Sequence, residues 1–198
     1  MTNYLQLMPS SEHKSSVTYD QARAIWLEAK QKHVELLIKT LWFTGLRITE
    51  VMGITGGSLT VDAGEYSLTV TRQKQVRRKR RKKNDTALTL TEKLPIPREL
   101  GLDLREFITR AQVGVAERLF PRHRATYWRQ VQQCARSAGL PNWKDIHPHS
   151  FRHGFIYDKA SKNVHPFLLA RLAGHKNVRT TLGYYEPTDR DIREAMER

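Results

Sequence analysis

The chain has 198 residues, of which 39% are hydrophobic and 27% charged, with a formal net charge of +14 and a pI near 10.2. This length suits one well-buried domain, and the charge favours a polyanionic partner, because neutralised phosphates release their counterions. A membrane surface is the competing polyanion, but no apolar run approaches the roughly 18 residues that span a bilayer. The polar residues 1–16 lack the apolar core of a signal peptide and are expected to form a flexible leader. The single cysteine, Cys134, excludes an intramolecular disulfide and a Cys-based zinc site, and a cytoplasmic, nucleoid-associated location fits.

The first part of the chain predicts three helices. Thr18 suits an N-cap, and apolar residues at helical spacing predict a helix over residues 19–33. Residues 34–44 are apolar nearly all round, so we expect a buried helix there. Gly45 is predicted to end that helix, and a short helix over residues 47–53 follows.

Residues 59–96 predict a sheet, because apolar and polar residues alternate. Between the alternating stretches lies a run with nine basic residues in twelve, residues 72–83, and Asn84 and Asp85 form a turn signal. A hairpin with a basic tip is the simplest interpretation. Pro95 and Pro97 are expected to end the sheet region.

The rest of the chain predicts helices. Their expected ranges are 98–114, 124–138, 148–160, 164–173, 179–186 and, as a C-terminal tail helix, 188–197. The fold class is therefore α+β, mainly helical with a small antiparallel sheet.

His149 and Arg152 form the first candidate site. Pro148 suits the first turn of a helix, so His149 and Arg152 would share a face, three residues apart, near the helix N-terminus. An imidazole, a guanidinium and the free N–H groups of the helix end can then meet one anion. The alternative is an ordinary His and Arg on the surface.

Arg47 and the tyrosines are further candidates. Arg47 follows a buried helix and must find a counter-charge or an anion; Glu50 can hold it, and a plain Arg47–Glu50 pair is the alternative. Tyr184 and Tyr185 compete as nucleophiles. A phenol with a pKa of about 10 needs nearby positive charge for that role, whereas most such tyrosines are core residues.

Metal and nucleotide sites find little support. Five histidines lie between His147 and His175, and some of their spacings imitate zinc-ligand pairs, but no His-Glu-x-x-His motif accompanies them. Neither Gly-x-Gly-x-x-Gly nor Gly-x-x-x-x-Gly-Lys occurs, which argues against a nucleotide cofactor. We therefore expect no metal and no cofactor.

The basic run has three interpretations: a solvated loop, a nuclear localisation signal, or a hairpin that follows a DNA groove and its phosphates. The alternating residues on both sides favour the hairpin. The residues expected to bind DNA are Arg72, Arg77, Arg78, Lys79, Arg80, Arg81, Lys82 and Lys83.

Taken together and in this order, the motifs resemble the catalytic domain of the tyrosine recombinases, the phage-type integrase family. Residues 44–50, Thr-Gly-Leu-Arg-Ile-Thr-Glu, are similar to its first arginine box, and His149-Ser-Phe-Arg152-His153 to its second. Ala-Gly-His175 and a tyrosine nine residues later are similar to its His/Trp position and nucleophile. The resemblance covers residues 17–187 and implies that family's fold.

The resemblance also implies roles for the site residues. Arg47 and Arg152 would bind the non-bridging oxygens of a phosphodiester, and Tyr184 would attack phosphorus to form a 3′-phosphotyrosine. Lys74 would donate a proton to the 5′-oxygen. His149 and His175 would contact the phosphate, and Glu50 and His153 would support the site.

The activity implied is site-specific DNA recombination through a Holliday junction, typical of integration and mobile genetic elements, by a homotetramer on double-stranded DNA with accessory DNA-bending proteins. The alternatives are a non-catalytic DNA-binding regulator with the same fold and a type IB-like topoisomerase. The family usually has an N-terminal core-binding domain, and only about 16 residues precede the matching region here. We therefore expect either a fragment or a relative of the short recombinases that invert fimbrial promoter DNA.

Overall fold

The computed structural model describes residues 16–73, 89–175, 177–185, 193, 196 and 197. Nearly all of the predicted leader, most of the basic run and most of the predicted tail helix lie outside the described residues.

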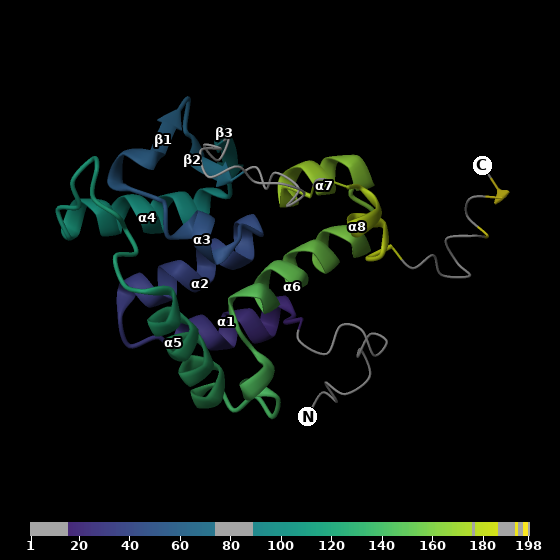
Figure 1. Ribbon diagram of the computed structural model, residues 1–198, viewed down its shortest axis with the longest axis horizontal. Helices are drawn as coiled ribbons and strands as arrows, with labels where there is room; N and C mark the ends of the chain where they lie inside the picture. Colours follow the sequence, from purple (N-terminus) through teal and green to yellow (C-terminus); the bar gives the residue numbers. More distant parts are fainter. Residues whose placement is uncertain (1–15, 74–88, 176, 186–192, 194–195, 198) are drawn as a thin grey trace, which may run out of the picture.

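The described chain forms a layer of helices beside one small sheet (Figure 1). The α-helices are α1 (Tyr19–Leu27), α2 (Lys32–Thr44), α3 (Ile48–Val51), α4 (Arg98–Arg110), α5 (Arg124–Ser137), α6 (Pro148–Ser161), α7 (Pro166–Ala173) and α8 (Arg179–Leu182). The 3₁₀ helices are η3 (Gly56–Ser58) and η4 (Trp143–Asp145). The antiparallel sheet has the order β1-β2-β3, with β1 (Leu59–Asp62), β2 (Glu65–Gln73) and β3 (Thr89–Ile96). The predicted fold class is confirmed.

Helix α2 lies at the centre of the helical layer and contacts α1, α3, α4, α5 and α6. Its side chains are buried on nearly all sides, as its apolar composition predicted. The helix ends at Gly45, which has a φ of +61°, as predicted. A Cβ at Gly45 would overlap the ring of Phe155 in α6, so this glycine also lets α6 approach the end of α2.

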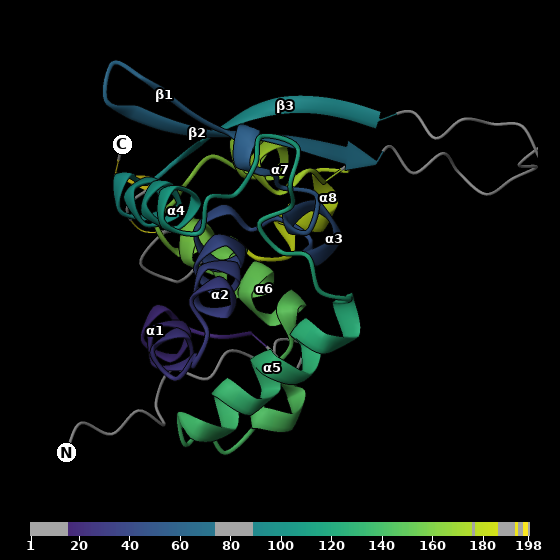
Figure 2. The ribbon, with the colours of Figure 1, turned by 90° about the vertical axis from the view of Figure 1, so that its left-hand side faces the viewer.

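Figure 2 shows the sheet along one edge of the molecule, with the helices on one side of it. The central strand, β2, buries Tyr66, Leu68 and Val70, and both β1 and β2 contact α4. The alternation of apolar and polar residues that predicted the sheet matches this burial. The paired strands β2 and β3 extend to Gln73 and Thr89, so the basic run begins with the last two residues of β2.

Some predicted boundaries were wrong. The helix predicted over residues 19–33 ends at Leu27, and the next helix begins at Lys32. The chain reverses there, which allows Trp26 to pack against Phe43 with their ring centroids 5.9 Å apart. Such a contact between helices is invisible to a local periodicity, whereas the Thr18 cap, which depends on Gln21 alone, was predicted correctly.

Pro95 does not end the sheet, contrary to our expectation. It lies within β3 and pairs with Ser67 of β2. Strand β3 is an edge strand, where a residue without an N–H is tolerated because its nitrogen can face away from the partner strand.

The helices predicted over residues 98–114 and 179–186 are shorter than expected. Helix α4 ends at Arg110, just before Gln112 takes a positive φ of 51°. Helix α8 ends at Leu182, so Tyr184 lies beyond it. In the described parts of the chain, no helix combines the length and the apolar character needed to cross a bilayer.

Candidate active site

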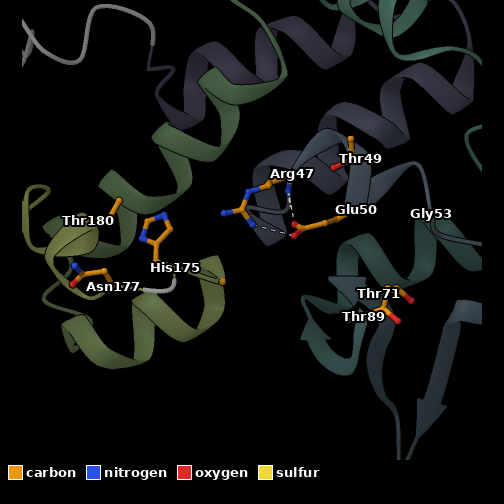
Figure 3. A pocket seen from close by; sticks show the side chains of 10 residues that line it. Arg47, Thr49, Glu50, Gly53, Thr71, Thr89, His175, Asn177 and Thr180 are labelled. Carbon is orange, nitrogen blue, oxygen red and sulfur yellow. Dashed lines mark hydrogen bonds and ion pairs between the residues drawn. The ribbon is translucent and has the colours of Figure 1, made fainter. Parts of the chain in front are cut away.

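A cleft of about 490 Å³ opens between α3, the ends of β2 and β3, and the segment that joins α7 to α8. Figure 3 shows Arg47 reaching from one wall towards His175 on the other. Its lining residues come from four distant parts of the chain: Arg47, Thr49, Glu50, Gly53, Thr71, Thr89, Gly174, His175, Asn177 and Thr180. The fold therefore brings the predicted first arginine box and the predicted His175 motif to one cleft.

Arg47 is the N-cap residue of α3, and its side chain is 38% exposed. Its backbone N–H and Nη1 both donate to the Glu50 carboxylate, at 2.7 and 3.1 Å. Glu50 itself is buried, so the pair holds Arg47 at a defined place while part of the guanidinium stays open to the cleft. The predicted Arg47–Glu50 pair exists, and its geometry leaves donors available for an anion.

Arg152 is buried in α6, with 5% of its surface exposed. Its Nη1 donates to the carbonyl of Gly45 at 2.6 Å, and its Nη2 donates to the carbonyl of Ala173 at 2.5 Å. These carbonyls end α2 and α7, so the guanidinium joins two helix C-termini, whose partial negative charge favours a cation. Burial and, after it, the charge of Arg47 lower the pKa of Arg152 to about 10.

His175 follows the end of α7, after Gly174. Its Nδ1 lies 2.7 Å from Oγ1 of Thr181, a fully buried residue, and either atom can be the donor. Burial, followed by the charges of Arg152 and Arg47, lowers the pKa of His175 to about 4. The imidazole is therefore neutral near pH 7, with its ring held by Thr181.

His149 lies in the first turn of α6, where Pro148 occupies the predicted position. The His149 residue is exposed, in contrast to Arg152 three residues later. Partial burial of its ring and then the charges of its neighbours, among them Arg152 and Arg47, lower the pKa of His149. The ring of His147 stands between His149 and Trp128: it stacks on Trp128 at 4.6 Å and meets His149 edge-on at 6.2 Å.

Tyr184 lies just beyond α8 and is half-buried. Its hydroxyl is 2.5 Å from Nδ1 of His153, and the two rings stack with centroids 6.0 Å apart. Burial raises the pKa of Tyr184, while Arg152 opposes that rise. The phenol therefore needs a base close by before it can act as a nucleophile, and His153 is in contact with it.

Tyr185 has a different environment from Tyr184. Its hydroxyl donates to the backbone carbonyl of Val164. Both tyrosines pack against a small apolar cluster built from α6 and α7, and the Tyr184 hydroxyl contacts His153, one of the predicted site residues.

Arg72, predicted to bind DNA, is buried with 7% of its surface exposed. Its guanidinium pairs with Glu92 and donates to backbone carbonyls of α7, which is an internal arrangement. The other residues predicted to bind DNA, and Lys74, lie outside the described residues. Among the described histidines, cysteines and carboxylates, no three gather as metal ligands.

Sequence reasoning missed two contributors to this region. Thr181 holds the His175 ring, and the only signal for it is its place six residues after that histidine. Arg124, at the start of α5, is close enough to lower the pKa of His149, and no local pattern marks it.

The sequence profile of the Phage integrase family matches residues 15–190. The chain is 26% identical over 171 residues to a tyrosine recombinase of Pseudothermotoga lettingae, covering 84% of this chain and 54% of the relative. It is 24% identical over 203 aligned positions to tyrosine recombinase XerA of Pyrococcus furiosus, covering 96% of this chain and 63% of the relative. The chain thus spans a little over half the length of these relatives.

Solved structures share the fold. A crystal structure of XerA recombinase superposes with a TM-score of 0.68 at 16% identity, covering 96% of this chain and 65% of that one. The Tn1549 transposon integrase in complex with circular intermediate DNA gives a TM-score of 0.70 at 22% identity, covering 95% of this chain and 68% of that one. The catalytic domain of bacteriophage HP1 integrase gives 0.58 at 16% identity, and 94% of its length is covered by 92% of this chain.

The two arginine boxes, the histidine motif and the tyrosine predicted this kinship, and the profile match extends over most of the chain. The chain therefore belongs to the phage integrase family, the tyrosine recombinases.

Proposed function

We propose that residues 17–187 are the catalytic domain of a site-specific tyrosine recombinase, which cuts and rejoins DNA strands by transesterification. The observation that carries this proposal is the state of Arg152: its buried guanidinium donates to two backbone carbonyls, and the charge of Arg47 acts on it more strongly than the opposing charge of Glu50. Arg47 and His175 lie near it, so a phosphate would supply the missing negative charge.

The cutting step uses the side chains that would surround the bound phosphate. Oη of Tyr184 attacks phosphorus, a bond forms between them, and the bond from phosphorus to the 5′-oxygen breaks. The phenolic proton passes to Nδ1 of His153, which lies 2.5 Å away in the structure. The leaving 5′-oxygen takes a proton from Lys74, the donor expected from the sequence, and the product is a 3′-phosphotyrosine.

The other residues stabilise charge on the phosphate. Arg47 and Arg152 donate to its non-bridging oxygens, and His149 and His175 provide further hydrogen bonds. Because Arg47, Arg152 and His175 are held by Glu50, by helix-end carbonyls and by Thr181 respectively, little reorganisation of these three groups is needed as charge develops. Rejoining is the same reaction reversed, with a 5′-hydroxyl attacking the phosphotyrosine.

DNA is the proposed partner, bound through the basic residues 77–83 in addition to the cleft. Each neutralised phosphate releases counterions, so affinity for a duplex should fall steeply with salt. Measuring the dissociation constant of a short duplex across a salt series checks this assignment. A flat response between low and moderate salt would contradict it.

At the level of the whole reaction we propose two strand exchanges through a Holliday junction by a homotetramer, with accessory DNA-bending proteins. A type IB-like topoisomerase would relax supercoiled plasmid without joining two sites. A non-catalytic regulator would keep its function when Tyr184 is replaced by phenylalanine. The contact between Tyr184 and His153 favours the catalytic alternatives, because a DNA-binding regulator needs no such pair.

Covalent trapping tests the proposal directly. The protein is incubated with fragmented DNA, denatured with detergent, and the DNA that stays attached is recovered and sequenced. We expect adducts with the wild type and with Tyr185→Phe, and none with Tyr184→Phe. Tyr185→Phe is the matched control, since it removes a neighbouring hydroxyl that bonds to the Val164 carbonyl.

Other outcomes are equally informative. Adducts lost with Tyr185→Phe and retained with Tyr184→Phe would move the nucleophile by one residue. No adducts from the wild type, even after fusion to a core-binding domain, would leave a DNA-binding protein without strand-cutting activity.

A further inference from the structure

Arg72 stands at a junction between the sheet and the site. It is the second-last residue of β2 and pairs in the ladder with Leu90 of β3. Its side chain is almost completely buried, although it is the first residue of the basic run that the sequence assigns to DNA binding. A buried guanidinium requires internal acceptors, and the contacts of Arg72 show what they are.

The guanidinium of Arg72 caps the C-terminal end of α7. Its Nη2 donates to the carbonyl of Leu172 at 2.8 Å, and Nη1 lies 3.5 Å from the carbonyl of Arg171. Glu92 of β3 pairs with Nη2 at 2.7 Å and balances the charge. Because Arg152 donates to the next carbonyl, that of Ala173, two arginines from separate elements satisfy successive carbonyls that end this helix.

Gly174 makes room for this contact. It has a φ of +64°, and a Cβ at this position would overlap Nη1 of Arg72. Glycine is therefore required here for two separate reasons, backbone conformation and the close approach of a side chain.

The capped end of α7 leads directly into His175. The N–H of His175 donates to the carbonyl of Ala170 at 2.8 Å, so His175 is hydrogen-bonded to the same helix end whose carbonyls bind Arg72. Thr71 and Thr89, on adjacent strands beside Arg72, line the same cleft as Gly174 and His175. The place of the His175 ring in the cleft thus depends on how β2 is joined to α7.

We infer that Arg72, held by Glu92, is a positioning residue that couples the β2–β3 ladder to the α7 end and so sets the place of His175. The inference rests on the proposed function for its effect on cleavage, but the contact itself is testable without cleavage. It assigns Arg72 an internal role in place of the DNA contact expected from its sequence neighbours.

The first test measures the ring nitrogen chemical shifts of His175 by nuclear magnetic resonance. In the wild type, the ring nitrogen shifts should report one tautomer, because Nδ1 is bonded to Thr181. Arg72→Met should give averaged shifts of a mobile ring. Arg110→Met is the matched control, because it removes an exposed arginine that also pairs with a glutamate, Glu106.

Gly174→Ala tests the same contact from the other side, because its methyl group would displace the guanidinium. Its control is Gly139→Ala, where φ is +74° but nothing lies within 4 Å of the added Cβ, so the backbone penalty occurs without the clash. We expect averaged His175 ring signals with Gly174→Ala and wild-type signals with Gly139→Ala.

The second test separates positioning from DNA binding. The substrate is the DNA recovered by covalent trapping, used at a saturating concentration. With it, Arg72→Met should lower the single-turnover cleavage rate by up to about 100-fold. Its affinity for a short random-sequence duplex and the salt dependence of that affinity should stay those of the wild type. In a His175→Ala background, Arg72→Met should cause little further loss, since the residue it positions is absent.

A lower salt dependence of duplex binding in Arg72→Met, with the His175 ring signals unchanged, would overturn the inference and make Arg72 a phosphate contact. Unchanged ring signals with both Arg72→Met and Gly174→Ala would also overturn it. If the wild type forms no adducts, the proposed function fails, while altered ring signals in these variants would still support the positioning role.

Discussion

Lys39 and Arg152 are two buried cations with different hydrogen-bond partners. Lys39, in α2, is 9% exposed, and its Nζ lies 2.6 Å from Asp103 and 3.2 Å from Glu35. Arg152, in α6, is 5% exposed and donates to two backbone carbonyls, and within the described ranges it has no ion-pair partner.

The ionisation of the two groups reflects this difference. Burial by itself would lower the pKa of Lys39, but hydrogen bonds to Asp103 and Glu35 raise it above its ordinary value. For Arg152, burial and the neighbouring Arg47 both lower the pKa, to about 10. A cation surrounded by carboxylates is needed for stability, because removing it leaves buried charge without a partner, whereas a cation held by carbonyls beside another cation is prepared for an anion.

Arg152→Lys should have the largest effect on activity. We expect the single-turnover rate of adduct formation to fall by about 100-fold or more, the usual effect of removing a positioned donor. A lysine ammonium cannot bond both helix-end carbonyls in the fork geometry of arginine and still serve the phosphate. Adduct formation at the wild-type rate would show that the carbonyl-held guanidinium is not needed for the chemistry.

Lys39→Met should have its effect on stability instead. Removing the ammonium leaves Asp103 without its buried partner, whereas Glu35 keeps its pair with Lys32, and the free energy of unfolding should fall by about 3 kcal/mol. Urea denaturation measures this loss, and Asp103→Asn in the Lys39→Met background should recover part of it. A loss of duplex affinity with unchanged stability would reverse the roles that we assign to the two cations.

Thr181→Val should have a smaller effect than Arg152→Lys on the cleavage rate. The substitution keeps the shape of a fully buried side chain but removes the hydroxyl that holds Nδ1 of His175. One hydrogen bond of about 1 kcal/mol corresponds to a roughly fivefold slower cleavage. Thr181→Ser should restore the rate, and equal rates for Val and Ser would mean that the hydroxyl does not orient the ring.

His175 should also titrate well below the usual range of an imidazole. Its pKa is lowered from 6.5 to about 4, so the free energy of unfolding should decrease as pH falls through this range, because the unfolded chain takes up the proton first. Inorganic phosphate bound beside Arg152 and Arg47 should raise the pKa of the imidazole, which a nuclear magnetic resonance titration detects. An unchanged pKa at saturating phosphate would argue against an anion site at Arg152.

Local features of the site could be predicted from the sequence. The Arg47–Glu50 pair joins residues three apart, and the placement of Pro148 at the start of α6 depends on one turn of helix. The position of His153 next to Arg152 was also visible, but its contact with the Tyr184 hydroxyl was not, because 31 residues separate them. The two residues come into contact only in the folded chain.

Sequence alone determined the fold class, the family and the local structure at Thr18 and Gly45, because these depend on composition, ordered motifs and contacts within a few residues. Only the tertiary structure decided which arginines are buried. The acceptor carbonyls for Arg152 lie 107 and 21 residues away, and one for Arg72 lies 100 residues away. In sequence, Arg72 belongs to the basic run; in the folded chain, the end of α7 covers it, because that helix end offers carbonyls that a guanidinium can satisfy.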